Sequence, residues 1–183
     1  MQVLTMEQGT PEWLTARLGP VTKSELKVLL VKGKGPGGLS AGANYRGTGR
    51  AVSRQRPYPP LAYAGRRCRP LYCDTTGEPK PYEVGIILNH NVGYSPDSLV
   101  GINGLLEIKT KLPKFQIEVL LKGKIPEEYI PQCQGGLWVS EREWLDFVSF
   151  WPGMPLFIQR AYRDEVMIRT IVDRVEAFHE EME

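Results

Sequence analysis

The sequence has 183 residues, of which 42% are hydrophobic, and this is enough for one sizeable core, so we expect a single domain over residues 1–183. The formal net charge of +2 is too small to indicate a nucleic-acid partner by itself. Three cysteines without CxxC spacing argue against a disulfide framework and a zinc site, and they fit a reducing compartment. Neither a signal-peptide pattern nor a run of about 18 apolar residues occurs, so we expect a cytoplasmic protein that does not enter a membrane.

Two helices are predicted at the N-terminal end of the sequence. Thr10 is a suitable N-cap residue and Pro11 fits a first helical turn, and apolar residues follow at helical spacing until Gly19–Pro20. A second helix is predicted from Thr22, because a stretch rich in leucine and valine follows it as far as Gly33.

Residues 44–72 form an atypical segment that is rich in arginine and proline. Seven arginines occur between residues 46 and 69, and neither aspartate nor glutamate occurs anywhere between Leu26 and Cys73. Because residues 46–70 have neither helical nor strand periodicity, we expect no regular element there.

Strands are predicted after this segment. Residues 82–88 are typical of a strand that continues through residues 92–94 into the Ser95-Pro96-Asp97 stretch. Asn103-Gly104, a dipeptide suited to a tight turn, separates Leu99–Val100 from residues 105–109. We therefore expect an antiparallel pair at the centre of a sheet.

The second half of the sequence predicts helices and further strands. Residues 115–121 and 126–137 are predicted to be helical, and residues 137–139 and 144–150 to be strands. Residues 163–183 carry apolar side chains on one broad face, as in an amphipathic helix.

Asp97, Glu107 and Lys109 form the constellation that indicates chemistry. Glu107 and Lys109 are two residues apart and therefore lie on one face of their strand, and the hairpin brings Asp97 beside them. Carboxylates are the hard ligands that magnesium prefers, and an adjacent lysine can orient a water that attacks a phosphodiester. The backbone carbonyl of Ile108 is a further candidate ligand.

The alternative is purely structural: a salt bridge between Glu107 and Lys109 on a solvated face, with Pro96-Asp97 as an ordinary turn. The setting favours the nuclease interpretation, because these charged residues interrupt the apolar run of Leu105, Leu106 and Ile108, and a charge in such a place needs a partner or an ion.

Three motifs resemble the lambda-exonuclease-like (YqaJ) phage recombination nucleases of the PD-(D/E)xK superfamily. They are QGTPEWL with the following RLG and VTKS, GYSPDSLVGINGLLEIKTKLP with its SPD...ExK core, and IPQCQGGLWVSEREWLDFVSFWPG with a glutamine-containing helix. The resemblance implies an α/β fold in which helices flank a mixed central sheet.

The resemblance also implies roles for individual residues. Asp97 and Glu107 would bind Mg²⁺, or Mn²⁺ in its place, Lys109 would serve the attacking water, and Gln132 would support the site from the neighbouring helix. The residues that match the family's contacts to the terminal 5'-phosphate of DNA are Arg17, Ser24 and Ser95. A helix-start role is the alternative for Ser24, and a surface position on a helix is the alternative for Gln132.

By the same resemblance, the protein would be a 5'-to-3' exonuclease of duplex DNA ends, encoded by a phage or prophage and acting in the cytoplasm of the bacterial host. The product would be a 3' single-stranded overhang that passes to a single-strand annealing protein. A homotrimer is implied as the assembly.

One departure from the family pattern lies in residues 44–72, where family members carry a helix with a Trp-Gly pair and a metal-binding glutamate. No acid between residues 26 and 73 can replace that glutamate. A shifted reading frame bounded near Tyr45 and Leu71 is one explanation, and a basic loop that grips DNA phosphates is the other. The alternative function is therefore a catalytically impaired protein that binds DNA ends.

Overall fold

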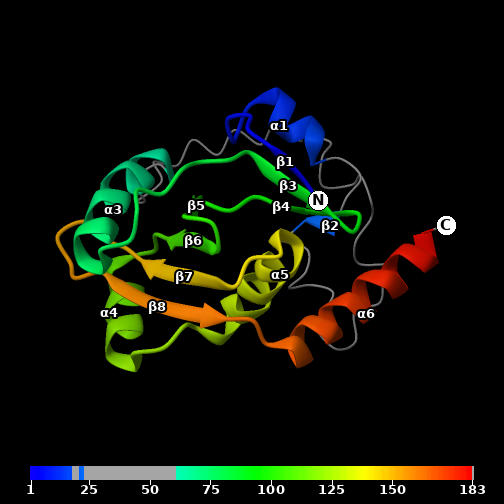
Figure 1. Cartoon of the computed structure of the whole chain (residues 1–183). Coiled ribbons are helices and arrows are strands. Elements are labelled where there is room, and N and C mark those ends of the chain that lie inside the picture. Colours follow the sequence, from blue (N-terminus) through cyan, green and yellow to red (C-terminus); the bar gives the residue numbers. More distant parts are fainter. Residues whose placement is uncertain (18–20, 23–60, 183) are drawn as a thin grey trace, which may run out of the picture.

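The computed structural model describes residues 1–17, 21–22 and 61–182, with strands in the middle and helices around them (Figure 1). Within these residues, no helix combines the length and the apolar character that crossing a membrane requires. The elements in chain order are β1 (Gln2–Leu4), α1 (Pro11–Ala16), β2 (Val21–Thr22), α3 (Leu61–Thr76), β3 (Ile86–Asn89), β4 (Val92–Tyr94), β5 (Ser98–Val100), β6 (Gly104–Lys109), α4 (Pro113–Lys122), the 3₁₀ helix η2 (Glu127–Tyr129), α5 (Ile130–Ser140), β7 (Trp144–Ser149), β8 (Phe157–Tyr162) and α6 (Glu165–Met182).

The strands form two four-stranded sheets, in the orders β1-β3-β4-β2 and β5-β6-β7-β8. In the second sheet the central pair β6–β7 is parallel and the two outer pairs are antiparallel. In the first sheet β2 and β4 are parallel, and the other pairs are antiparallel. Both sheets are mixed and have helices around them, which confirms the predicted α/β fold class.

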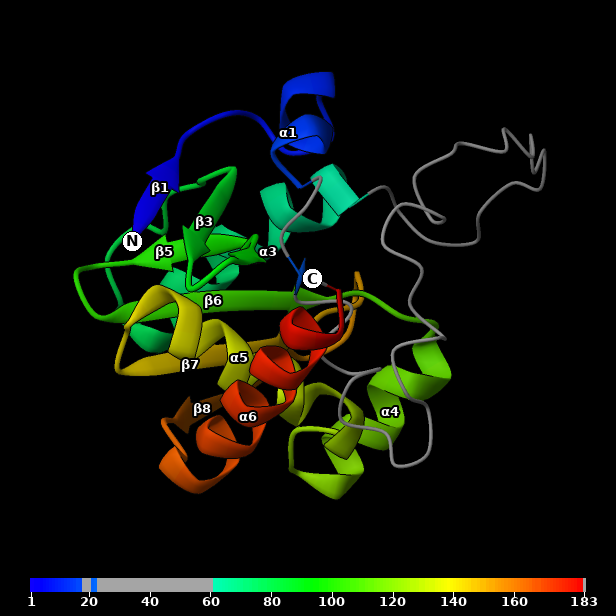
Figure 2. The same cartoon turned by 90° about the vertical axis from the view of Figure 1, so that its right-hand side faces the viewer.

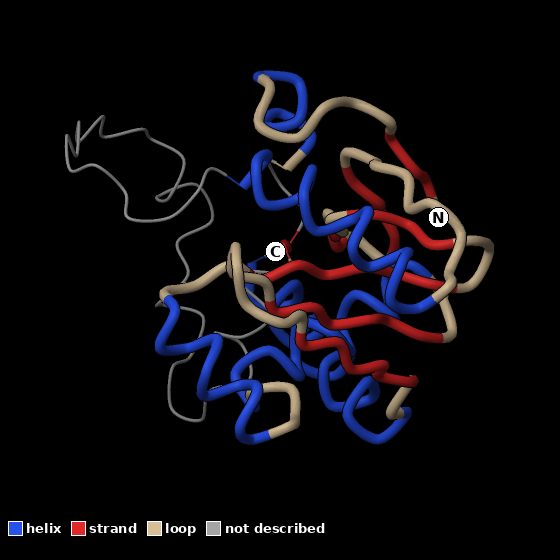
Figure 3. Tube along the Cα trace, turned by 90° about the vertical axis from the view of Figure 1, so that its left-hand side faces the viewer, coloured by secondary structure: helices blue, strands red, loops and turns tan. Residues whose placement is uncertain are grey.

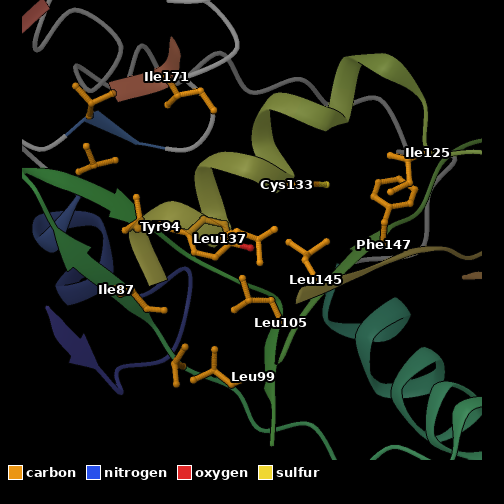
Figure 4. Packing of buried hydrophobic residues seen from close by; sticks show 14 of the residues in the cluster. Ile87, Tyr94, Leu99, Leu105, Ile125, Cys133, Leu137, Leu145, Phe147 and Ile171 are labelled. Carbon is orange, nitrogen blue, oxygen red and sulfur yellow. The ribbon is translucent and has the colours of Figure 1, made fainter. Parts of the chain in front are cut away.

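Helices α3 and α5 cover opposite faces of the second sheet (Figures 1 and 3). Leu105 of β6 packs in one buried cluster with Leu137 of α5, as Figure 4 shows. Leu106, the next residue in β6, packs in the other cluster with Tyr72 of α3. Alternate side chains of β6 therefore face α5, and Glu107 and Lys109 share that face with Leu105. Helix α6 packs on the outer side of α5 (Figure 2).

The predicted antiparallel pair around the candidate site is confirmed, but its position at the centre of the sheet is wrong because β5 is an edge strand, and its turn is shifted. Strands β5 and β6 are antiparallel, and Ser98 lies opposite Leu106. The turn comprises residues 101–103, with a φ of 53° at Gly101, so Gly104 is the first residue of β6. A Cβ atom at Gly104 would lie 2.2 Å from the Trp144 ring, so the close approach of this tryptophan requires the glycine.

The predicted strand over residues 82–94 is in fact a hairpin of β3 and β4. His90 and Asn91 have φ values of 52° and 56°, and this left-handed pair is typical of the tight turns that join antiparallel strands. Tyr82 makes an isolated bridge to Leu99. Strand β4 leads directly into Ser95-Pro96-Asp97 and so carries this motif to the second sheet.

Helices α1, α4 and α6 confirm their predictions. In α1 the Thr10 side chain caps the helix and accepts a hydrogen bond from the Trp13 amide. The helix ends at Ala16, earlier than the predicted end at Gly19–Pro20. Val21 and Thr22 form strand β2, and residues 23–33 of the second predicted helix lie outside the described residues.

The prediction of no regular element over residues 46–70 is wrong for residues 61–70, which belong to α3; residues 46–60 lie outside the described residues. Cys68 and Tyr72 are four residues apart, and both are fully buried on the face of α3 that meets the second sheet. This packing outweighs the helical hydrogen bond that is missing at Pro70, whose nitrogen carries no hydrogen.

The prediction of a strand at residues 137–139 is also wrong, because these residues complete α5. Helix α5 is buried on nearly all sides, and periodicity does not distinguish a short apolar run in a buried helix from one in a buried strand. Strand β8, which closes the second sheet, and the short edge strand β1 were not predicted.

Replacing Leu137 with alanine is expected to lower the free energy of unfolding by about 2–5 kcal/mol. Leu137 is 0% exposed in the cluster between α5 and the second sheet, so its truncation leaves a cavity there. Urea unfolding followed by circular dichroism measures the change. Leu121→Ala is the matched control, because Leu121 is 81% exposed on α4; equal losses in the two variants would contradict the packing of α5.

Candidate active site

The start of strand β5 brings Asp97 beside the middle of β6. Asp97 is half-buried, and its Oδ2 atom accepts a hydrogen bond of 2.6 Å from the backbone N–H of Ile108. Ile108 lies between Glu107 and Lys109, so the predicted constellation is assembled at one place. The role of the Ile108 carbonyl as a metal ligand stays a prediction.

Glu107 is the most deeply buried member of the site, with 1% of its side chain exposed. Its Oε1 atom accepts hydrogen bonds from the Lys109 ammonium group at 2.6 Å and from the Gln132 amide at 2.5 Å. Its Oε2 atom lies 3.4 Å from the Tyr94 hydroxyl. Gln132 is thus a member of the site, contributed by α5, and its alternative of a surface position is wrong.

The charge on Lys109 is maintained by its neighbours. Burial disfavours an ammonium ion and lowers the pKa of Lys109, but the negative charges of Glu107 and Asp97 outweigh this effect, so the pKa of Lys109 is raised above its ordinary value. Lys109 therefore remains a cation at neutral pH and can act as a fixed positive charge and hydrogen-bond donor.

Tyr94 is buried beside Glu107, and its hydroxyl group donates a hydrogen bond to the Glu107 carboxylate. The side chain is 1% exposed, and burial together with the charge of Glu107 raises the pKa of Tyr94 well above its ordinary value. A Cβ atom at Gly136 of α5 would come within 2.5 Å of the Tyr94 ring, so the glycine provides the space in which this ring lies.

The donor set of Asp97 and Glu107 fits a hard divalent cation. Magnesium prefers oxygen ligands and is commonly held by one or two carboxylates while several waters complete its coordination. Within residues 1–17, 21–22 and 61–182, no group of three or more histidine, cysteine, aspartate or glutamate side chains could hold a metal. The described site therefore offers two acids, and water or substrate would supply the other ligands.

Trp13 connects the N-terminal helix to the SPD motif. Its indole N–H group donates to the hydroxyl of Ser95 at 3.1 Å and to the backbone carbonyl of Gly85 at 3.0 Å. The Arg17 guanidinium lies 4.3 Å from the centre of the Trp13 ring. Arg17 and Ser95, two of the three predicted phosphate contacts, thus flank one tryptophan, while Ser24 lies outside the described residues.

Gln8 fixes the same junction from the other side, since its side-chain amide donates to the carbonyl of Pro96 at 2.7 Å and to that of Val84 at 2.9 Å. The sequence analysis did not single out Trp13 or Tyr94 for the site. The QGTPEW and GYSPD motifs contain these two residues, and their position beside the predicted site residues is the signal that could have found them.

The fold and the site define a restriction-endonuclease-like α/β core that carries two acids and a lysine on one mixed sheet. The YqaJ-like viral recombinase domain family matches residues 68–143. No curated protein sequence is similar enough to count as a match.

Among solved structures, the chain is similar to the alkaline exonuclease LHK-Exo from Laribacter hongkongensis, with 33% identity and a TM-score of 0.76 over 94% of this chain and 92% of that one. The structure of LHK-Exo in complex with dAMP gives 34% identity and a TM-score of 0.73 over the same shares. The chain therefore belongs to the YqaJ-like, lambda-exonuclease-like family.

Proposed function

We propose that the protein is a magnesium-dependent exonuclease that digests one strand of linear duplex DNA from its 5' end in phage-type homologous recombination. The observation that carries the proposal is the convergence of Lys109 and Gln132 on one oxygen of the buried Glu107, with Asp97 held beside them by the Ile108 amide. Membership of a family that includes an alkaline exonuclease supports the same reaction.

In this proposal Asp97 and Glu107 hold Mg²⁺, with Mn²⁺ as a substitute. When bound, such an ion supplies positive charge at the scissile phosphate and Lewis-acid activation of water. Lys109 adds a fixed ammonium group that can orient the attacking water and stabilise negative charge on the phosphate. Gln132 orients the Glu107 carboxylate from α5.

The proposed site for the terminal 5'-phosphate comprises Arg17, Ser95 and Ser24. In the part of the chain that the structure describes, the buried Nε atom of Arg17 has no hydrogen-bond partner. A buried donor without a partner is costly, and a phosphate oxygen would satisfy it. The Ser95 hydroxyl, which accepts a hydrogen bond from Trp13, supplies a second polar group of the proposed site.

We further propose that the protein acts in the cytoplasm of a bacterial host, that it assembles as a homotrimer, and that its 3' overhangs are received by a single-strand annealing protein. These proposals rest on the family alone. Analytical ultracentrifugation of the purified protein tests the trimer, and a monomer at working concentrations would contradict it.

The polarity of digestion can be measured with two duplexes that differ in the position of one label. A duplex with one blocked end carries the label at either the 5' or the 3' terminus of the accessible strand. Digestion from the 5' end releases the 5' label in the first products and the 3' label last. Early release of the 3' label, or cleavage of a closed circle, would contradict a 5'-to-3' exonuclease.

Arg17→Ala is expected to lower the preference for 5'-phosphorylated ends over 5'-hydroxyl ends by roughly 10- to 100-fold, as expected when a hydrogen bond to a charged group is lost. Competition between the two kinds of end in one digestion measures the preference. Arg174→Ala removes an exposed arginine from α6 and should leave it unchanged. A preference that survives in Arg17→Ala would remove Arg17 from the phosphate site.

The second candidate function is a protein that binds DNA ends without cutting them. The observation that favours it is that the described residues supply two acids and no group of three for a metal. Such a protein would bind duplex ends with a steep salt dependence and release no nucleotides with any divalent cation.

A further inference from the structure

Arg69, in the arginine-rich part of α3, makes contacts with all three guanidinium nitrogens, and two of these contacts are to the Asp97–Ser98 pair beside the candidate site. Its Nε atom donates to the Ser98 hydroxyl at 2.7 Å, and Nη2 donates to the backbone carbonyl of Asp97 at 2.8 Å. The Nη1 atom lies 2.7 Å from a carboxylate oxygen of Glu83. The planar guanidinium thus joins α3 to the residue pair at the start of β5.

Gly65, which precedes Arg69 by one turn of α3, leaves space for the Arg69 guanidinium. A Cβ atom at Gly65 would lie 2.8 Å from the Nη1 atom of Arg69. Arg66 and Arg67, by contrast, are exposed on α3. Arg69 is therefore distinguished from its neighbours in the same segment by facing the second sheet.

The contacts of Arg69 bear on the orientation of the Asp97 carboxylate. The backbone carbonyl of Asp97 accepts hydrogen bonds from Arg69 and from the Ser98 hydroxyl, and its carboxylate accepts one from the Ile108 amide. Ser98, the next residue, is fully buried and lies opposite Leu106 in β6. Without Arg69, the Asp97–Ser98 pair would lose its guanidinium contacts to α3.

We propose that Arg69 is a positioning residue of the metal site, which acts by clamping the Asp97–Ser98 backbone so that the Asp97 carboxylate is presented beside Glu107. The proposal rests on the proposed function for the metal that these acids bind. It predicts that metal affinity depends on Arg69 although no atom of Arg69 would touch the metal. Removing a residue that orients a metal ligand typically weakens metal binding by about 10- to 100-fold.

The test measures Mn²⁺ binding by isothermal titration calorimetry without DNA, together with thermal unfolding, for the parent and variants. Arg69→Lys keeps the charge but cannot reproduce the three-way contact, and it should weaken Mn²⁺ binding by about 10- to 100-fold. Tyr72→Phe is the matched control, because it removes one buried hydrogen bond of the same helix, the 2.6 Å bond to Asp146. It should lower the melting temperature and leave Mn²⁺ affinity within about twofold of the parent.

A purely structural role for Arg69 predicts a different result, in which Arg69→Lys and Tyr72→Phe both lower the melting temperature and neither alters Mn²⁺ affinity. That result overturns the proposal. If Arg69→Lys does not fold, Ser98→Ala, which deletes the acceptor of the Arg69 Nε atom, should weaken Mn²⁺ binding by about 10-fold; unchanged affinity in Ser98→Ala overturns the proposal as well.

The Mn²⁺ affinity of the parent distinguishes a failure of the role proposed for Arg69 from a failure of the metal-dependent function on which it rests. A parent that binds no Mn²⁺ contradicts the metal-dependent function, and the role of Arg69 fails with it. A parent that binds Mn²⁺ as tightly as Arg69→Lys contradicts the role of Arg69 alone.

Discussion

The Lys109→Ala variant is expected to cut DNA at least about 100-fold more slowly than the parent while binding duplex ends with similar affinity. The Lys109 ammonium lies 2.6 Å from the Glu107 carboxylate and keeps its charge in a largely buried place. In the proposed function, its removal eliminates the cation that would orient water at the phosphate, whereas Arg17 and Ser95 of the proposed 5'-phosphate site are unchanged.

Single-turnover digestion of a 5'-phosphorylated duplex measures the rate, and fluorescence anisotropy without divalent cations measures binding. Lys124→Ala is the control, because Lys124 is 64% exposed and pairs only loosely with Glu127, at 3.8 Å. It should cut at the rate of the parent. Equal rates for Lys109→Ala and the parent would show that Lys109 is not part of the catalytic machinery.

The Glu107→Gln variant is expected to bind Mn²⁺ more than about 100-fold more weakly than the parent, since it loses a charged ligand where even an orienting neighbour changes affinity by about 10- to 100-fold. The substitution keeps the size of the side chain, so packing against Tyr94 and Gln132 should persist. Removing a negative charge should also leave DNA binding intact or strengthen it, because DNA phosphates are anionic.

Calorimetric titration with Mn²⁺ measures this change, and Glu118→Gln on the exposed face of α4 is the control for loss of one carboxylate. Unchanged Mn²⁺ affinity in Glu107→Gln would place the metal elsewhere and contradict the site. Weak metal binding together with intact DNA binding in Glu107→Gln would agree with the assignment.

The centre of the site could be predicted from the sequence because it depends on local geometry. Glu107 and Lys109 share a face through the period of two in a strand, and a turn of three residues suffices to bring Asp97 back to them. The contact of Gln132 with Glu107 spans 25 residues and followed only from the family resemblance, since no periodicity indicates which face of α5 meets the sheet.

Tertiary packing explains two wrong predictions of secondary structure. Residues 137–139 were predicted as a strand because a short apolar run fits a buried strand and a buried helix equally well, but these residues belong to α5, in which Gly136 provides the space for the Tyr94 ring. Helix α3 was not predicted because its arginines and Pro70 give no apolar periodicity, although Cys68 and Tyr72 are buried on one face of the helix. Neither contact is visible within a window of neighbouring residues.

The contacts of Arg69 with the candidate site could not be predicted from the sequence for the same reason. Its partner Asp97 is 28 residues away, and the sequence indicated only an unusual density of arginine between residues 46 and 69. The structure separates the exposed arginines of α3 from the one that meets the candidate site. The alternative interpretation of residues 44–72 as a basic loop is therefore wrong for residues 61–72, which belong to α3, and Arg69 contacts Ser98 and Asp97 within the protein.

The central claim is that two acids and a lysine on one sheet suffice for a metal-dependent exonuclease. Digestion of 5'-phosphorylated linear duplex DNA by the purified protein, with magnesium and with a chelator, tests it most directly. Nucleotides should be released with magnesium, and release should stop with the chelator and in Glu107→Gln. Release that continues in the chelator, or no release with magnesium from a protein that binds DNA ends, would contradict it.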